Sequence, residues 1–234
     1  MTERTTTVDV AGRSVFLREW GDPDAPVVLF LHGAGDDGRQ AEGLVSAIAG
    51  DWRLVAPDLP GHGRSPRADV DEYRPTRLAA LVLALLDDLG AASAALVGFS
   101  WGAAICCHVA ARSPERVRSL VLLEGGHIDF HDLRDFDPTA LAADEGVPTA
   151  MRRGLVDEPA VPTYSALRKS RLPVVLVTAL RDEALTQLRV DPLTRLRQEV
   201  PHADVVRIAA GGHDLLEGDD GTIARLVAGR LELQ

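Results

Sequence analysis

The stretch Gly98–Gly102, with the sequence Gly-Phe-Ser-Trp-Gly, constrains the fold of this chain more than any other part of the sequence. It follows an apolar run typical of a buried strand, Ala94–Val97, and leads into a pattern typical of a helix, Trp101–Arg112. A serine held on a sharp turn from strand to helix needs small residues two positions before and two positions after it, and the two glycines supply them. The turn would place the Ser100 hydroxyl above the amino end of the helix, where the helix dipole favours developing negative charge. The sequence therefore predicts a nucleophilic serine at the carboxyl edge of a sheet.

Strand-like and helix-like segments alternate along most of the chain. The segments Val8–Val10 and Phe16–Trp20 predict an N-terminal hairpin. Further strands are predicted at Val27–Leu31, Leu54–Ala56, Ala94–Val97, Ser119–Leu123, Leu172–Thr178 and Val205–Ile208. Helices are predicted at Arg39–Ala49, from a capping Thr76 onward, and at Trp101–Arg112, Pro192–Val200 and Thr222–Leu231. This alternation predicts an α/β fold with a mostly parallel sheet and helices on both faces.

The alternation is interrupted between Gly125 and about Lys169, where prolines and acids are scattered and no strand-like run occurs. Such a length is unusual for a plain loop in a compact domain, so a short lid insertion is predicted. The predicted division is a core formed by residues 1–124 and 171–234, with a lid over residues 125–170. A partly ordered surface excursion is the alternative interpretation of the same segment.

Charge and cysteine content limit the partners and the compartment. The 234 residues include 25 Lys and Arg against 35 Asp and Glu, a net charge of −10, which disfavours nucleic acid or an anionic membrane as the main partner. The two cysteines, Cys106 and Cys107, are adjacent and poorly placed to join distant elements. The first residues lack the apolar stretch of a secretory signal, and these features together predict a reduced, cytoplasmic protein. Nothing in the sequence predicts an oligomeric state.

The order of these elements and the Gly98–Gly102 motif resemble the α/β-hydrolase fold family, and the resemblance extends over nearly the whole chain. In that family a strand-borne nucleophile is followed along the chain by an acid, and then by a histidine near the C-terminus. The resemblance implies that Ser100 is the nucleophile of a catalytic triad whose other members lie downstream.

His213 is the candidate for the histidine of this triad, since it follows the predicted strand Val205–Ile208 and has glycines before it that let a loop bend sharply. An imidazole that titrates near neutrality can take the serine proton and return it to a leaving group. Asp182, at the end of the run Val174–Asp182, occupies the place where similar hydrolases keep the acid that orients the histidine. Two rivals to Asp182 exist. Glu183 is adjacent to it, and Glu124 ends the preceding strand, a position that some family members use instead; Glu124 stays open as the main alternative acid.

The glycines after the predicted strand Val27–Leu31 permit two interpretations. Gly33–Gly38 fits the pattern G-x-G-x-x-G, and Asp58 follows the next strand, as in a dinucleotide-binding fingerprint. Against this, Asp36 and Asp37 would face a pyrophosphate from within the loop meant to bind it. The dinucleotide interpretation also leaves the predicted triad unexplained, so no cofactor is predicted.

The family resemblance gives the same glycines another role. His32–Gly35 resembles the His-Gly-x-Gly loop whose backbone N–H groups point at the substrate oxygen. The resemblance implies an oxyanion hole formed by the backbone amides of Ala34 and Trp101. Asp58–Ser65 matches a loop typical of the family after the next strand, and is predicted to be structural, with its aspartate and Arg64 holding the turn.

A possible metal site is set aside. His127 and His131 would share one face of a helix, but no third or fourth ligand is evident near them. We interpret this stretch as a solvated part of the lid entrance, and no metal is predicted.

These features predict a serine hydrolase that cleaves a small carboxylic ester or thioester through an acyl-enzyme, with a small acyl compound as its partner. The same triad would also serve a hydrolase of C–C or amide bonds, or a perhydrolase that uses peroxide in place of water. A ligand receptor that keeps the fold with vestigial turnover is the alternative from outside catalysis.

Overall fold

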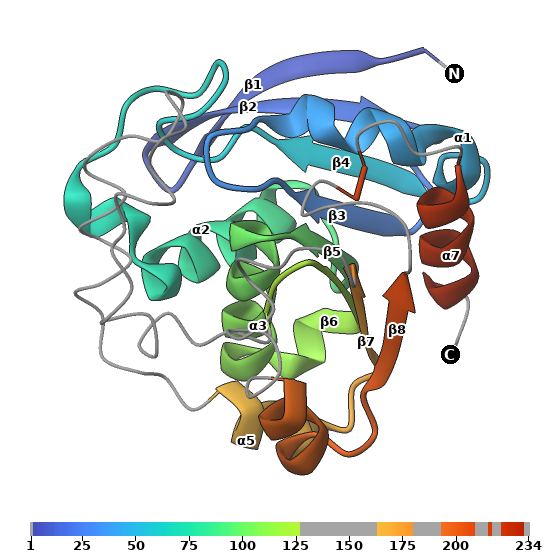
Figure 1. The fold of residues 1–234 in the computed structure, drawn as a ribbon. Coiled ribbons are helices and arrows are strands. Elements are labelled where there is room, and N and C mark those ends of the chain that lie inside the picture. Colours follow the sequence, from blue (N-terminus) through green and yellow to red (C-terminus); the bar gives the residue numbers. More distant parts are fainter. Residues whose placement is uncertain (1, 127–162, 180–192, 209–214, 217–220, 232–234) are drawn as a thin grey trace.

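The computed structural model describes residues 2–126, 163–179, 193–208, 215–216 and 221–231. Within these residues the chain forms an eight-stranded sheet in the order β1-β2-β4-β3-β5-β6-β7-β8 (Figure 1). The first three strands of this order pair antiparallel, and all the later pairs are parallel. The predicted α/β fold with a mostly parallel sheet is therefore confirmed.

The elements follow the alternation seen in the sequence. The strands are β1 (Arg4–Val10), β2 (Arg13–Trp20), β3 (Val27–Leu31), β4 (Arg53–Pro57), β5 (Ala94–Phe99), β6 (Val117–Leu123), β7 (Val174–Ala179) and β8 (Asp204–Ile208). The α-helices are α1 (Val45–Ile48), α2 (Pro75–Asp88), α3 (Trp101–Arg112), α5 (Thr163–Ser170) and α7 (Thr222–Leu231), and residues 193–199 are also helical. The short 3₁₀ helices are η1 (Gly38–Leu44), η2 (Val70–Tyr73) and η3 (Pro114–Arg116). Every predicted strand overlaps one of the observed strands.

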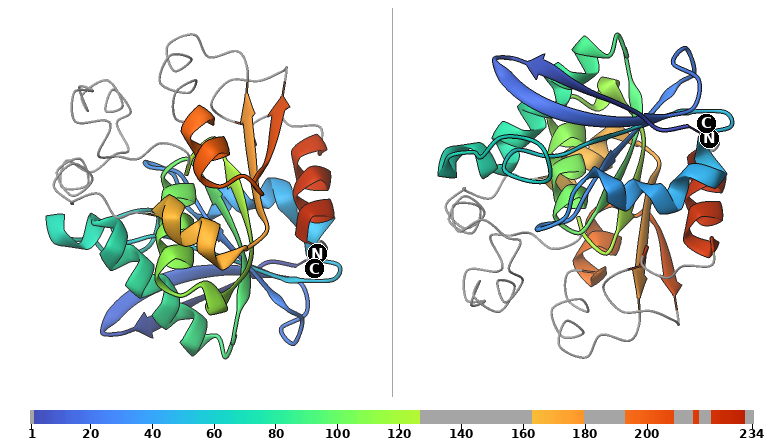
Figure 2. Two further views of the ribbon diagram at one scale, coloured as in Figure 1. Left: turned by 90° about the horizontal axis from the view of Figure 1, so that it is seen from below. Right: turned by 90° about the horizontal axis from the view of Figure 1, so that it is seen from above.

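Helices cover both faces of the sheet (Figures 1 and 2). The side chains of β3 alternate between them: Val27, Leu29 and Leu31 belong to the apolar cluster that contains residues of α2, α3 and α5. Val28 and Phe30 belong to a second cluster, formed with residues of η1, α1 and α7. A strand buried on both faces has an unbroken apolar sequence, which is why β3 could be recognised from its residues.

Two predicted helix details are wrong. Thr76 does not cap α2: the helix begins at Pro75, and Arg74 is its N-cap residue and makes no side-chain capping bond. Proline is favoured at the first helical position, where its missing N–H has no partner to lose. The predicted helix Arg39–Ala49 is instead the 3₁₀ helix η1 followed by one turn of α-helix.

Most of the predicted lid, residues 127–162, lies outside the described residues. The end of the predicted lid segment forms α5, which packs on α3. Tyr164 and Leu167 of α5 are buried in the same apolar cluster as α3. Across the described ranges, no helix is long and apolar enough to cross a bilayer.

The topology determines where a site can form. The chain passes from β3 to β4 on one side and then continues at β5 on the other side of β3. In an open parallel sheet, the crevice at such a reversal, outside the carboxyl ends of the strands, is the usual place for a ligand. The loops that follow β3 and β5 meet at this edge, and they contain the predicted oxyanion loop and Ser100.

Candidate active site

Ser100 lies on a sharp turn between β5 and α3, as the sequence predicts. Its backbone has φ +49° and ψ −111°, a left-handed conformation that costs a non-glycine residue about 1–3 kcal/mol. The turn is held by a hydrogen bond of 2.8 Å from the Ser100 N–H to the Leu123 carbonyl at the end of β6. The side chain is half-buried at the amino end of α3. This strained geometry is the one expected for a serine presented to a substrate.

The two glycines of the motif are required by close backbone approaches. A Cβ atom at Gly98 would lie 2.5 Å from the Ala103 nitrogen. At Gly102 it would lie 2.0 Å from the Leu31 carbonyl oxygen and 2.7 Å from that of His32. The atoms that such a Cβ would meet are backbone atoms of α3 and of the end of β3, which cannot move independently. The turn therefore fixes α3 tightly against the end of β3.

Replacing Gly102 with alanine is expected to lower the free energy of unfolding by at least about 4 kcal/mol, because the added methyl group overlaps the backbone of β3. Urea denaturation followed by circular dichroism measures this loss. Gly229 is the matched control: it lies in helix α7, and beyond the backbone of that helix a Cβ there would meet no heavy atom of the described residues within 4 Å. Gly229→Ala should raise the free energy of unfolding by about 0.5–1 kcal/mol. A Gly102→Ala protein as stable as the wild type would contradict this account of the turn.

Two other loops approach Ser100 closely. A Cβ at Gly33 would lie 3.6 Å from the Ser100 Cβ and 2.8 Å from Phe99 Cδ1, so the loop after β3 runs directly beside the serine. A Cβ at Gly125 would lie 2.2 Å from the Ser100 carbonyl oxygen, so the loop after β6 also abuts the turn. The structure therefore brings the loop that contains Ala34 next to Ser100. Trp101 begins α3, and the N–H groups of a first helical turn have no acceptor within the helix.

Glu124 lies immediately after β6, at the same edge of the sheet. Its side chain is only 3% exposed, and its Oε1 accepts a hydrogen bond from the Ala179 N–H at the end of β7. The alternative acid is therefore buried between the ends of two strands, one residue before the glycine that abuts Ser100. Asp182 and His213 lie outside the described residues, so their assignment stays a prediction. His127 and His131 lie outside them as well, and the described ranges contain no cluster of three or more His, Cys, Asp or Glu side chains that could hold a metal ion.

A buried aromatic cluster beside Ser100 was not predicted from the sequence. The rings of His32 and His62 lie 5.1 Å apart, and the His62 ring lies 5.2 Å from that of Trp101 and 6.3 Å from that of Tyr73. Both histidines occupy loops, yet His32 has no exposed surface and His62 is 4% exposed. The sequence gives one signal for the burial of His32, which is that it directly follows the unbroken apolar run of β3.

Burial lowers the pKa of both imidazoles. The pKa of His32 falls from about 6.5 to about 3, mainly because burial disfavours the charged form and secondly because His62 lies nearby. A hydrogen bond to Gly33 and the charge of Asp37 oppose this shift without cancelling it. Burial also lowers the pKa of His62. An imidazole with so low a pKa is a weak base near neutral pH, so His32 is not a candidate for the group that accepts the serine proton.

The free energy of unfolding should fall as the pH drops from about 6.5 towards 3. His32 binds a proton with its ordinary pKa in the unfolded chain, but only near pH 3 in the folded protein, so acid favours unfolding throughout this window. The contribution of one such group reaches about 1.4 kcal/mol per pH unit. Urea denaturation at pH 7, 6, 5 and 4 measures the slope, which should be shallower in His32→Asn. Equal slopes in the two proteins would show that His32 is not buried in its neutral form.

Asp58 is a structural residue rather than a ribose ligand. It is fully buried, and its Oδ1 accepts the Gly38 N–H at 2.8 Å while its Oδ2 accepts the Arg64 N–H at 2.7 Å. A carboxylate engaged with two backbone amides and closed to solvent has no surface to offer a ribose, which counts against the dinucleotide interpretation. The predicted structural role is found, although the guanidinium of Arg64 holds the loop differently from expectation and lies over the Phe16 ring, 4.1 Å from its centroid.

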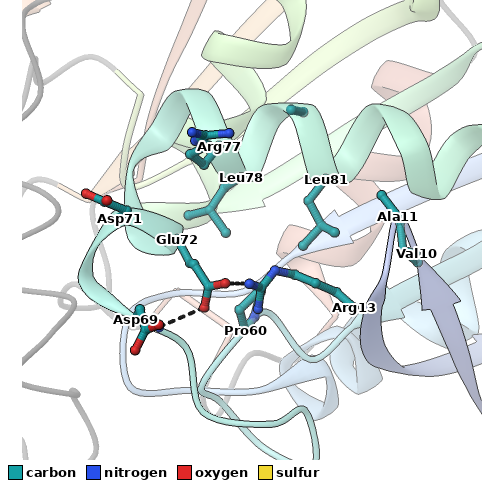
Figure 3. Close-up of a pocket in the computed structure, with 11 residues that line it drawn as sticks. Val10, Ala11, Arg13, Pro60, Asp69, Asp71, Glu72, Arg77, Leu78 and Leu81 are labelled. Carbon is teal, nitrogen blue, oxygen red and sulfur yellow. Dashed lines mark hydrogen bonds and ion pairs between the residues drawn. The ribbon is translucent and has the colours of Figure 1, made fainter.

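A groove of about 430 Å³ opens between the β1–β2 hairpin and α2 (Figure 3). Arg13 of β2 forms an ion pair with Glu72 of η2 across it, and the Asp69 N–H donates to Glu72 Oε2 at 2.7 Å. Leu78 of α2 contributes to its apolar wall. Its described lining includes no residue of the turn at Ser100 or of the loop after β3, so this groove is separate from the candidate active site.

Comparison with known proteins agrees with this architecture. A family model described as alpha/beta hydrolase fold matches residues 26–165. The chain is 32% identical over 203 residues to a haloalkane dehalogenase from Mesorhizobium japonicum, in an alignment that covers 82% of this chain and 64% of the dehalogenase. It is 40% identical over 111 residues to the lipase LipV of Mycobacterium tuberculosis, covering 46% of this chain and 40% of the lipase. The chain thus spans less than two thirds of the length of either curated relative.

One similar solved structure is a loop variant of a haloalkane dehalogenase from Bradyrhizobium elkanii. It matches with a TM-score of 0.78 and 27% sequence identity, and the match covers 98% of this chain and 96% of that one. The relatives that carry this arrangement of strands and helices therefore have different names and different substrates, so the chemistry has to be argued from the residues of the site.

Proposed function

The chain belongs to the α/β-hydrolase family, and from this premise we propose that it is a serine hydrolase acting on a small carboxylic ester or thioester. The single observation that carries the proposal is Ser100, held in a left-handed conformation on the turn from β5 to α3 and flanked by glycines that tolerate no Cβ. A backbone strained in this way at a polar residue is typical of a group presented for catalysis.

The identity of this residue selects among the activities named for the relatives. If a serine oxygen displaced a halide from an alkyl carbon, or opened an epoxide, the product would be an alkyl ether on the protein. An ether has no carbonyl carbon for water to attack, so the enzyme would stop after one turnover. Attack on an ester or thioester gives an acyl-enzyme instead, whose carbonyl can be hydrolysed. Ser100 therefore favours acyl substrates over the haloalkanes of the relatives named as dehalogenases.

The proposed reaction has two halves. In the first, the Ser100 hydroxyl attacks the acyl carbon while His213 takes its proton and passes it to the departing alcohol or thiol. In the second, water loses a proton to His213 and attacks the acyl carbon, and His213 then gives that proton to the Ser100 oxygen as the bond to it breaks, which releases the carboxylic acid and the free serine. Asp182 holds the imidazole in the required tautomer, with Glu124 as the alternative acid. The amides of Ala34 and Trp101 stabilise the oxyanion of each tetrahedral intermediate, and each such donor is typically worth ~10²–10³ in rate.

The position of the oxyanion loop supports this assignment. Gly33 approaches Ser100 so closely that a Cβ atom there would lie 3.6 Å from the serine Cβ. The next residue along the chain is Ala34, whose amide therefore belongs to the same edge of the sheet as the nucleophile. A hydrolase of C–C or amide bonds, or a perhydrolase, would use the same groups, and a panel of substrates distinguishes them.

The test measures the turnover of these substrates by the purified protein. We expect an initial burst and continuing turnover with p-nitrophenyl acetate and with an acyl thioester, with a cutoff as the acyl chain is lengthened. Bromobutane and styrene oxide should release neither bromide nor diol. Sustained halide release would contradict the proposal, because Ser100 would then not be the nucleophile. Rapid labelling by a fluorophosphonate without turnover of any ester would favour the receptor interpretation.

A further inference from the structure

The side chain of His32 connects the loop after β3 to the loop after β4. Its Nδ1 lies 2.7 Å from the Gly33 carbonyl oxygen, and its Nε2 lies 2.9 Å from the Leu59 backbone nitrogen. The ring has no exposed surface, so water does not compete for either hydrogen bond. Neither contact belongs to the triad or to the oxyanion hole, and the two contacts together determine how the ring is protonated.

The direction of these two hydrogen bonds fixes the tautomer. The Leu59 N–H can only donate, so Nε2 must accept and carries no proton. Burial lowers the pKa of His32 to about 3, so the neutral ring keeps one proton, and that proton is on Nδ1. Nδ1 therefore donates to the Gly33 carbonyl oxygen. The same oxygen accepts a second, longer hydrogen bond of 3.3 Å from the Asp36 N–H.

Gly33 and Ala34 share the peptide group that this carbonyl belongs to. A peptide group is planar, and in the trans form its C=O and N–H point in opposite directions. The residues described contain no cis peptide bond. Holding the Gly33 oxygen towards His32 therefore directs the Ala34 N–H away from the imidazole. Because Gly33 abuts the Ser100 side chain, a rotation of this one peptide group would change where the amide points relative to the serine.

We propose that His32 is a positioning residue for the oxyanion hole: its Nδ1–H holds the Gly33–Ala34 peptide group so that the Ala34 N–H faces the substrate oxygen. The inference rests on the proposed serine hydrolase function and adds a residue outside the triad to it. Oxyanion donors stabilise a transition state because they are already oriented before charge develops. A misplacement of about 1 Å in such a group can cost ~10² in rate.

The second contact of His32 makes this orientation rigid. Leu59 directly follows Asp58, whose carboxylate binds the Gly38 N–H at the other end of the same loop. The loop after β3 is thus bound to the loop after β4 at both of its ends. His32 at its start accepts the Leu59 N–H, and the Gly38 N–H at its end donates to Asp58. Both fastening groups are fully buried. A peptide group held in this way has little freedom to turn when the substrate leaves.

Two substitutions separate the two hydrogen bonds. The amide of asparagine can replace Nδ1, so His32→Asn keeps a donor for the Gly33 oxygen and loses the contact to Leu59. The longer glutamine reaches the place of Nε2, so His32→Gln keeps an acceptor for Leu59 and loses the donor to Gly33. With p-nitrophenyl acetate, we expect His32→Gln to lower kcat by ~10–10² with KM nearly unchanged, and His32→Asn to recover most of that loss.

A purely structural role would give a different pattern: both variants would lose stability in urea, while the kcat of the folded protein would not depend on which hydrogen bond was removed. The amide resonance of Ala34, in a ¹H–¹⁵N correlation spectrum of the full chain, gives a readout that does not need activity. We expect this resonance to shift in His32→Gln and to stay close to the wild-type position in His32→Asn. An unchanged Ala34 resonance in folded His32→Gln would overturn the inference. Absence of ester turnover in the wild type would overturn the proposed function instead.

Discussion

Replacing Ser100 with alanine is expected to abolish the burst and the turnover of p-nitrophenyl acetate, lowering kcat by about 10⁶. The substitution removes the only atom that forms the acyl-enzyme in the proposed reaction. The backbone of the turn stays strained, because the alanine would keep the N–H bonded to the Leu123 carbonyl and the left-handed φ. The fold should therefore persist, and residual ester hydrolysis should come only from the oxyanion donors and binding. Stopped-flow detection of p-nitrophenolate measures both the burst and the steady state.

Ser119 provides a matched control for this experiment. It lies on β6 with its hydroxyl buried, and that hydroxyl has no hydrogen-bond partner within the described part of the chain. Ser119→Ala removes the same group from the interior without touching the site, so its activity should equal that of the wild type. If Ser100→Ala kept more than about 1% of the wild-type kcat, the observed hydrolysis would have to come from another nucleophile.

The position of Ser100 could be predicted because its constraints are local in sequence. The two glycines of the motif are dictated by contacts with backbone a few residues away or in the neighbouring strand, and β5 and α3 flank them directly. The strand β3 and the alternation of strands and helices could also be predicted from the sequence. A strand buried on both faces contains few polar residues, so its apolar run stands out. Within such a parallel sheet, the carboxyl ends of neighbouring strands meet at one edge, and this places the loop after β3 beside Ser100.

The role of His32 could not be predicted, since it depends on contacts between residues far apart in the chain. The imidazole binds Leu59, which is separated from it by η1, α1 and β4. Apart from its place directly after the apolar run of β3, nothing in the sequence indicates that the ring points into the core rather than into solvent. The first residue of α2 was also predicted wrongly, for a local reason. Two helix-start signals, Pro75 and Thr76, are adjacent in the sequence, and only the backbone shows which one the helix uses.

The choice between the two candidate acids also depends on long-range geometry. Both Asp182 and Glu124 follow strands whose carboxyl ends lie at the edge that carries Ser100, since β6 and β7 are neighbours in the sheet. The structure gives Glu124 a definite local role: with φ +50° it turns the chain out of β6, and its carboxylate accepts the Ala179 N–H. A side chain that binds the end of β7 in this way has a structural reason to be buried, and the orienting role stays predicted for Asp182.

Asp182→Asn is therefore expected to lower kcat for p-nitrophenyl acetate by ~10⁴, because the amide would hold the imidazole in the wrong tautomer and could not stabilise the imidazolium. Glu124→Gln is the matched comparison. Its amide oxygen can still accept the Ala179 N–H, so the fold is kept while the charge is removed; the hydrogen bond should weaken, since charged acceptors form bonds about twice as strong. We expect this variant to lose some stability in urea and to keep kcat within about tenfold of the wild type. A loss of ~10⁴ in Glu124→Gln, with Asp182→Asn close to wild type, would assign the acid to the end of β6 instead. Losses of that size in both variants would mean that the reaction depends on both carboxylates.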